Sequence, residues 1–366
     1  MKILILSENR YTNASGVEKY NRYLFELFHN LDHEISSYSL NLNWDRKDVY
    51  PIFNYVKEYN FDLNKTNNPF LKKKYIDSHI SKIIEISKNY DLVINTLNNV
   101  MWPKKIPNIN NWLYIQHFTP GFYEQKFLIH PLFGKLMNGL MYIGGVKNPF
   151  KIFNNFVTFS ENDKKELKIK KTKKTFSVPL AVYTIEEIEN FKKNIDYDKK
   201  IHDFVYLGRI NNHQKNICYI QTKFKNKDIS YYGNDNVSLI KDQNQYKGLY
   251  NSDNLFEILE PYKYGLMLSK YEGFPYVLIE MLSHGIPCII KMDSFAASNL
   301  FEISKLFTIN SESELDSKIN KILSIDSKEY KEISNQCFDY AIKNLSIDKF
   351  LDNWKAIIDF FENQKS

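Results

Sequence analysis

The chain has 366 residues, with a hydrophobic content of 43% and a charged content of 25%, which is ordinary for a soluble globular protein. This length excludes a single compact core and favours two domains. The net charge of +6 is only mildly basic, and the sequence has no zinc-finger, RRM or helix-turn-helix signature, so we expect no nucleic-acid partner.

The lack of a signal-peptide or membrane-span pattern, together with isolated cysteines, favours a cytoplasmic protein. No stretch approaches the roughly 18 consecutive apolar residues of a membrane span. The apolar run at 2–6 is shorter than the roughly 7–15 residues of a signal-peptide core, and it predicts a buried strand instead. Cys218, Cys288 and Cys337 are isolated and lack metal-ligand spacing, which is typical of a reducing compartment.

Apolar runs alternate with helical patterns along the chain, which predicts a parallel α/β protein. In the first half we expect strands at 2–6, 91–96, 111–117 and 155–160, and helices at 17–30 and 76–89. In the second half we expect strands at 203–208, 229–233, 264–269 and 287–291, and helices at 276–284 and 328–343. The strands are nearly continuous in Val, Ile, Leu and Tyr, as expected when both faces of a sheet are covered.

A polar and charged segment at 183–202 predicts the linker between a domain at 1–182 and a second domain at 203–345. This segment contains Asp196 and Asp198, and paired aspartates hold a divalent ion and a diphosphate in some transferases. Here no apolar strand leads into them, so a solvated loop is favoured and we expect no metal site.

The last segment, 346–366, has the pattern of an amphipathic helix with Ser346 as its N-cap. Its apolar stripe consists of Phe350, Trp354, Ile357, Ile358 and Phe361. A stripe of this kind requires a packing partner.

Two strand-to-helix turns carry features of an anion site. Gly16 opens the first predicted helix, where a glycine lets a ligand approach the backbone and the helix N-terminus favours negative charge, although capping alone explains it equally well. In the second turn, Gly208 and Arg209 follow a strand, and Lys215 lies near the start of the next helix. Two cations at the carboxyl end of one strand form a diphosphate clamp, the alternative being a polar loop with surface charges.

The stretch SKYEGFPYVLIEMLSHGIPCII places two acids in a strand–turn–helix–strand context. Glu272 follows the strand at the carboxyl edge of the sheet, where ligands bind in open α/β sheets. Gly273 and Pro275 shape the turn, and Glu280 follows in the early turns of the helix that Gly285 ends. A carboxylate at that position can accept two hydrogen bonds from a vicinal diol such as ribose.

This stretch resembles the E-x7-E region of retaining GT-B glycosyltransferases of the group 1, family 4-like class. Five further segments resemble motifs of that family, at 15–26, 114–120, 157–167, 206–216 and 231–234. The resemblance implies two Rossmann-like domains that face each other across a cleft, with the C-terminal helix crossing back to the N-terminal domain.

The resemblance also implies roles for individual residues. Glu280 would bind the ribose of a nucleotide-sugar donor, and Arg209 and Lys215 would neutralise its diphosphate. Glu272 and the backbone at Gly273 and Phe274 would contact the transferred sugar. Gly16 in the first turn and Gly208 in the second would lie beside the phosphates of the donor. His117 would lie near the reacting centre. A lone histidine such as His117 is otherwise more often a core or loop residue.

Two departures from the family pattern stand out. Ser15 precedes Gly16 where the family usually has two glycines, and residues 291–303 lack the usual glycine pair and acid. These departures affect the contacts expected with the donor at those positions, but not the class of protein that the other motifs indicate.

The expected activity is retaining, metal-independent transfer of a sugar from a nucleotide-diphosphate sugar, with a UDP-sugar favoured and no further cofactor. The expected acceptor is a glycan or lipid-linked glycan of bacterial cell-surface polysaccharide or glycoconjugate synthesis. The alternatives are a nucleotide-sugar epimerase or sugar phosphorylase of the same fold, and a non-catalytic GT-B partner subunit.

A surface for an anionic membrane is a further interpretation of two segments. Residues 122–156 mix aromatics, lysines and glycines, and residues 164–174 are rich in lysine. Ordinary core helix and loop for the first segment, and a solvated helix and loop for the second, are the simpler interpretations. The membrane interpretation would place the protein peripherally at the inner membrane face.

Overall fold

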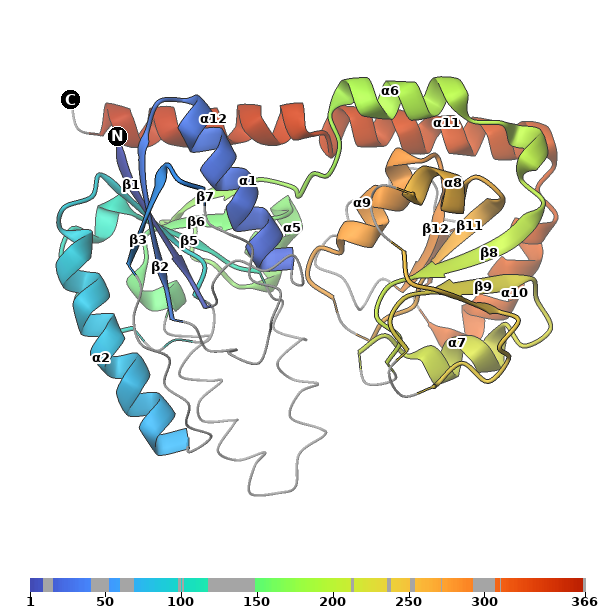
Figure 1. The fold of residues 1–366 in the computed structure, drawn as a ribbon, viewed down its shortest axis with the longest axis horizontal. Coiled ribbons are helices and arrows are strands. Elements are labelled where there is room, and N and C mark those ends of the chain that lie inside the picture. The colour runs from blue at the N-terminus through green and yellow to red at the C-terminus, as the bar shows by residue number, and fades with distance from the viewer. Residues whose placement is uncertain are drawn as a thin grey trace. The chain divides into compact units, whose positions relative to one another are not determined.

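The structure is a computed structural model that divides into two compact units (Figure 1). The N-terminal unit comprises Met1–Val178 and Asn353–Ser366, and the C-terminal unit comprises Pro179–Asp352. The structure describes residues 1–8, 16–40, 53–59, 69–97, 100, 102–117, 149–211, 214–235, 238–250, 254–270, 272–291, 307–309 and 311–364.

The described part of the N-terminal unit contains a seven-stranded sheet in the order β3-β2-β1-β4-β5-β6-β7, with all neighbours parallel. The strands are β1 (Lys2–Ser7), β2 (Glu34–Ser39), β3 (Val56–Tyr59), β4 (Leu92–Asn95), β5 (Trp112–Ile115), β6 (Asn155–Thr158) and β7 (Lys174–Ser177). The helices are α1 (Gly16–Asn30), α2 (Pro69–Ser87) and α5 (Glu161–Glu166), with the 3-10 turn η1 (Ile109–Asn111).

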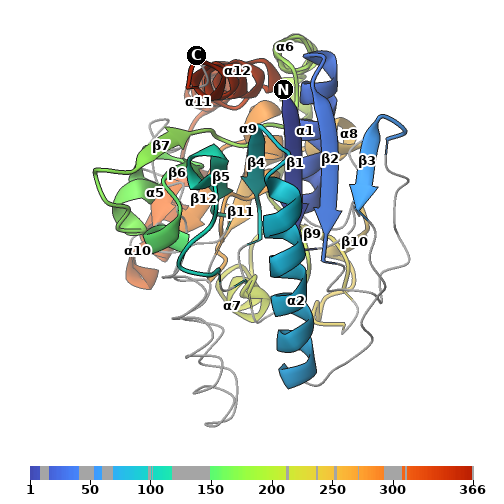
Figure 2. The same cartoon turned by 90° about the vertical axis from the view of Figure 1, so that its left-hand side faces the viewer.

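Helices cover both faces of this sheet, as its nearly continuous apolar strands require. α1 and α2 lie on opposite faces (Figures 1 and 2). On the α2 face, Leu4 and Leu6 of β1 belong to the same buried cluster as Ile80 and Ile83. The alternate residues of β1, Ile3 and Ile5, point to the other face and are also fully buried.

The C-terminal unit repeats the arrangement with a parallel sheet in the order β10-β9-β8-β11-β12-β13. Its strands are β8 (His202–Leu207), β9 (Ile229–Tyr232), β10 (Tyr246–Gly248), β11 (Tyr262–Met267), β12 (Cys288–Lys291) and β13 (Thr308–Ile309). Its helices are α6 (Ile185–Asn194), α7 (Ile217–Lys223), α8 (Leu255–Leu259), α9 (Tyr276–Ser283), α10 (Glu312–Leu323) and α11 (Ser327–Asn344), with the turn η2 (Tyr197–Lys199). α7 and α10 pack into one buried cluster with the sheet, and Tyr330 and Ile333 from the first half of α11 belong to the same cluster. α11 also packs against α6 and α9.

All eight strands predicted from the sequence are confirmed to within two residues at either end. The sequence pattern missed five strands, namely β2, β3, β7, β10 and β13. Four of these, β3, β7, β10 and β13, are short and form the edges of the two sheets as described. β2 was missed because three of its six residues are serine, although all three are buried.

The last helix, α12 (Ile347–Asn363), begins in the C-terminal unit and ends in the N-terminal unit. Ser346 caps it, since its hydroxyl accepts the Lys349 N–H at 3.2 Å. The whole predicted apolar stripe is buried. Trp354, in this stripe, contacts the Phe28 ring of α1 with centroids 5.7 Å apart, so the C-terminal helix packs on the N-terminal unit.

The segment 183–202, predicted as a linker, contains α6 and η2. A capping box between Thr184 and Glu187 starts α6, which packs against α11 through an ion pair between Lys192 and Asp339 at 2.6 Å. The Asp196 carboxylate caps η2 by accepting the Asp198 N–H at 3.1 Å. Within the described ranges, no cluster of three or more His, Cys, Asp or Glu residues is arranged to hold a metal ion.

The lysine-rich segment 164–174 runs from α5 through a turn into β7. Two of its lysines have partners: Lys173 donates to the Phe153 carbonyl at 2.7 Å, and Lys174 lies over the ring of Phe360 at 5.0 Å. Residues 118–148, which carry most of the other segment considered for a membrane surface, lie outside the described residues. In the part of the chain that the structure describes, no helix is both long and apolar enough to cross a membrane.

Candidate functional site

The candidate site in the C-terminal unit lies where the strand order reverses. β8 and β11 are neighbours, and the chain continues outward from them in opposite directions, to β9 and to β12. Ligands of open α/β sheets bind beside the carboxyl ends of two such strands, because their loops diverge there. The loop after β8 carries Arg209 and Lys215, and the loop after β11 carries Glu272.

Two glycines fix the start of the first loop. Gly208 and Gly233 have backbone φ values of +134° and +146°, which residues with a side chain rarely adopt. Their backbones also touch, since a Cβ on Gly233 would lie 1.8 Å from the Gly208 carbonyl oxygen. Tyr206, in β8, donates its hydroxyl to the Arg209 carbonyl at 2.9 Å. These contacts set the direction in which the chain, and with it Arg209, leaves the sheet.

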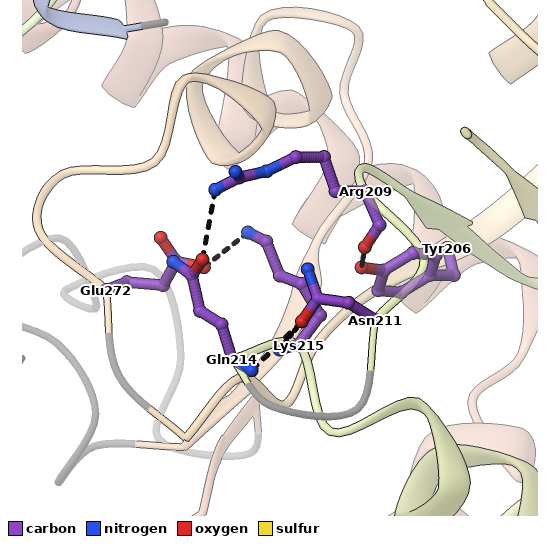
Figure 3. Close-up of polar contacts among 6 residues, drawn as sticks. All are labelled: Tyr206, Arg209, Asn211, Gln214, Lys215 and Glu272. Carbon is purple, nitrogen blue, oxygen red and sulfur yellow. Dashed lines mark hydrogen bonds and ion pairs between the residues drawn. The ribbon is translucent and has the colours of Figure 1, made fainter. Parts of the chain in front are cut away.

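Two neutral amides, which the sequence analysis did not single out, hold the cations in place (Figure 3). The Asn211 side-chain oxygen accepts the backbone N–H of Gln214 at 2.9 Å and that of Lys215 at 3.2 Å. The Gln214 side-chain oxygen accepts Arg209 Nη2 at 3.0 Å. An asparagine in a short polar loop is a known turn-former, which is the one signal that could have identified Asn211.

The positive charge of Lys215 meets a carboxylate from the second loop. Its Nζ forms an ion pair with Glu272 Oε1, and the two side chains are only 11% and 9% exposed. The guanidinium of Arg209 points toward the same region (Figure 3). Because Gln214 and Asn211 are uncharged, the three charged side chains leave one net positive charge, which suits an incoming anion.

The second loop joins the first through the backbone. Lys270 N–H donates to the Gln214 carbonyl at 2.8 Å. Beyond Glu272, Gly273 is half-buried and Phe274 is buried. α9 then begins at Tyr276, as predicted.

Glu280 lies in α9 and is 8% exposed. Burial, and next the Glu280 charge, raise the pKa of Tyr250, so this carboxylate lies within electrostatic range of the loop after β10. Burial also raises the pKa of Tyr206, with Glu272 and Tyr250 adding to the rise. Glu272 and Glu280 thus each lie within electrostatic range of a tyrosine, Tyr206 and Tyr250 respectively.

The end of α9 is fixed by Gly285 and His284. Gly285 has a φ of +68°, and a Cβ there would lie 2.3 Å from the Phe338 ring of α11, so both conformation and space require glycine. His284 Nδ1 lies 2.6 Å from the Glu280 carbonyl. Burial lowers the pKa of His284 to about 4, so its ring is neutral and donates this bond.

Two predicted site residues, Gly16 and His117, belong to the N-terminal unit. Gly16 is the exposed first residue of α1, and Ser15 before it lies outside the described residues. His117 follows β5 and is 7% exposed, and its burial lowers its pKa to about 3. The imidazole is therefore neutral at physiological pH. The other departure from the family pattern, at 291–303, lies outside the described residues except for Lys291.

The structure thus brings Lys215 and Glu272 into direct contact, and it holds Arg209 beside them through Gln214. Glu280 lies in the helix that follows Glu272, as the sequence predicted. Asn211 and Gln214 join the site as residues that the sequence analysis missed.

No protein-family model matches the chain, and no curated protein matches it. Solved structures do match over nearly the full length. A sucrose-phosphate synthase from Thermosynechococcus elongatus shares 13% identity, covering 100% of both chains with a TM-score of 0.67. WaaG, a glycosyltransferase involved in lipopolysaccharide biosynthesis, shares 11% identity over 92% of this chain and 95% of its own, with a TM-score of 0.65.

A third similar structure is HepE from Anabaena in complex with UDP-glucose, at 12% identity over 98% of this chain and 99% of its own, with a TM-score of 0.60. Identities this low establish the fold alone. With two parallel α/β units and a C-terminal helix that returns to the first, the chain has the GT-B fold of these glycosyltransferases.

Proposed function

We propose that this protein is a retaining glycosyltransferase that moves a sugar from a nucleotide-diphosphate sugar, with UDP-sugar favoured, to a hydroxyl of a glycan. The observation that carries the proposal is the convergence of Arg209, Lys215 and Glu272 at the strand-order reversal of the C-terminal unit. Similar structures include one that binds UDP-glucose and several named as glycosyltransferases.

In this reaction the bond between the anomeric carbon and the β-phosphate oxygen breaks, and the acceptor oxygen forms a new bond to that carbon. The acceptor proton passes to the departing diphosphate, which has gained the electron pair. Attack from the face that the diphosphate leaves retains the anomeric configuration. Fixed positive charge at the leaving group is the largest stabilisation available, and Arg209 and Lys215 supply it without a metal ion.

The remaining residues bind the donor. Glu280 accepts hydrogen bonds from the ribose hydroxyls, and Glu272 with the backbone at Gly273 and Phe274 contacts the transferred sugar. Gly208 lets the phosphates approach the loop after β8, and Gly16 does the same at α1. The neutral ring of His117 suits a hydrogen bond to a sugar hydroxyl near the reacting carbon, because it adds no charge to compete with the developing cation.

A donor screen followed by a transfer assay tests the proposal. UDP, GDP, ADP and their sugars are compared by thermal stabilisation, and we expect a UDP-sugar to raise the midpoint most. The best donor is then incubated with glycan acceptors, with and without EDTA. We expect anomer-retaining transfer that persists in EDTA. Conversion of the sugar without an acceptor would indicate an epimerase. Release of a sugar phosphate in the presence of inorganic phosphate would indicate a phosphorylase, and absence of donor binding would indicate a non-catalytic partner subunit.

The acceptor that we propose is a glycan or lipid-linked glycan of bacterial cell-surface polysaccharide synthesis. WaaG and the galactosyltransferase WaaB, both named for lipopolysaccharide, support it through the shared fold. The exposed Lys168, Lys170 and Lys171 provide positive charge for an anionic membrane at the inner face. Cosedimentation with vesicles of anionic lipid, but not with neutral vesicles, is expected, and replacing these three lysines with glutamine should abolish it.

A further inference from the structure

We infer that Trp354 of α12 is a positioning residue for His117, acting through the ring of Tyr20. This inference deepens the proposed function and rests on it where it concerns turnover. All three side chains belong to the N-terminal unit, although they come from three separate parts of the chain. The C-terminal helix would thereby serve the reaction as well as the stability of the fold.

The three rings form a continuous buried row. Trp354 and Tyr20 are fully buried. Their ring centroids lie 6.3 Å apart, and the Tyr20 and His117 centroids lie 5.2 Å apart with the planes at 83°. An edge-to-face contact of this kind fixes the rotation of the imidazole as well as its position. Trp354 is itself held from behind by Phe28 of α1.

Tyr20 lies between the other two rings and is enclosed on all sides. Burial raises the pKa of its hydroxyl, so the phenol stays neutral. Tyr20 therefore acts as a packing group that transmits the position of Trp354 to His117 through ring contacts.

Phe159 also contacts His117, with ring centroids 5.4 Å apart, and it contacts Tyr20 with centroids 6.0 Å apart, so the three rings pack against one another. Phe159 is fixed in turn by Asp163, whose carboxylate accepts the backbone N–H of Phe159 at 2.9 Å and that of Ser160 at 3.0 Å. Because Phe159 is held by hydrogen bonds of its own loop, the contact that depends on the C-terminal helix is the one from Trp354 through Tyr20 to His117. Without Trp354, the space behind Tyr20 would be empty, because protein interiors are close-packed and refill only in part.

The direct readout is the protonation of His117, followed by NMR of ¹⁵N-labelled histidine from pH 7 downward. In the wild-type protein we expect the ring to stay neutral above a pH of about 4, because burial holds its pKa near 3. In Trp354→Leu, water reaching the ring should raise its midpoint by at least about one pH unit, since loss of burial returns a histidine toward its ordinary pKa. Tyr20→Leu should do the same.

The control is Phe361→Leu, which changes another buried side chain of the same helix whose ring contact is with Phe360. It should lower thermal stability while leaving the His117 midpoint unchanged. Should Trp354→Leu fail to fold, Trp354→Phe keeps part of the ring contact, and a smaller shift in the same direction is expected. An unchanged His117 midpoint in folded Trp354 and Tyr20 variants would overturn the inference.

Turnover provides the second readout. With the best nucleotide sugar, Trp354→Leu should lower kcat at least about tenfold with the donor KM within about twofold, because a displaced catalytic group affects the reacting geometry more than donor binding. Phe361→Leu should leave kcat within about twofold. A full kcat in a variant whose His117 midpoint has shifted would overturn the inference. Absence of transfer by the wild-type protein would refute the proposed function instead, and the NMR titration would still decide whether Trp354 positions His117.

Discussion

Replacing Lys215 with methionine should destabilise the C-terminal unit more than the loss of a surface ion pair. Methionine is close to lysine in length but has no charge, so the substitution leaves the Glu272 carboxylate buried without its partner. Removing one member of a buried ion pair typically costs about 3–5 kcal/mol, because the remaining charge stays desolvated. We expect a cost of about 3 kcal/mol, at the low end of this range, since the neighbouring guanidinium of Arg209 can turn toward Glu272 (Figure 3).

The double variant Lys215→Met/Glu272→Gln should recover most of this loss, because it removes both charges together. Lys223→Met is the matched control. Lys223 pairs with Asp316 at 2.8 Å, but those side chains are 29% and 64% exposed. Loss of such a surface pair costs only about 0–1 kcal/mol.

Native-state hydrogen exchange at the amides of β11 and α9 measures the loss of stability in the C-terminal unit itself. A single unfolding midpoint would not, because the protein has two units. Equal effects of Lys215→Met and Lys223→Met would refute a desolvated ion pair at this site. A double variant no more stable than Lys215→Met would show that the loss comes from packing, not from the stranded charge.

Three further predictions concern Glu280, His284 and the C-terminal helix. Glu280→Gln should weaken UDP binding by about 1.5–3 kcal/mol in calorimetry, because it removes a charged acceptor for the ribose hydroxyls, whereas the exposed Glu257→Gln should not; equal affinities would refute the ribose assignment. His284 has a folded-state pKa of about 4 against an ordinary 6.5, so the native state binds fewer protons than the unfolded chain within this window, and stability is lost as the pH falls through it. Hydrogen exchange at α9 should therefore show a loss of up to about 3 kcal/mol between pH 7 and pH 4 that is absent in His284→Asn, and parallel losses in both proteins would contradict this. Deleting residues 346–366 removes Trp354 from Phe28, so amide protection in α1 should fall; unaltered protection there would contradict the packing of α12 on the N-terminal unit.

The sequence by itself determined the elements whose pattern is local. Eight strands are apolar along nearly their whole length, and burial on both faces of a sheet demands that composition wherever the strand lies. α9 could be bounded from Pro275 and Gly285 because turn and cap conformations depend on the residue that adopts them. The buried stripe of α12 was likewise visible, because helical spacing alone places those side chains on one face.

The family resemblance supplied the candidate residues, but their contacts belong to the tertiary structure. Lys215 and Glu272 are 57 residues apart in sequence, and they meet because β8 and β11 are neighbours in the sheet. In the sequence Asn211 and Gln214 look like ordinary polar loop residues. Only the fold places the Asn211 oxygen beside the backbone N–H of Lys215 and the Gln214 oxygen beside the guanidinium of Arg209.

His117 shows the difference between the two kinds of information most clearly. Its place at the end of a predicted strand is a local property, and the sequence showed it. The neutral state of its ring depends on burial against Tyr20 and Phe159. Tyr20 packs in turn on Trp354, which lies 237 positions after His117 in the chain. A pKa is set by the solvent and charges around a group in space, so only the tertiary structure could decide it.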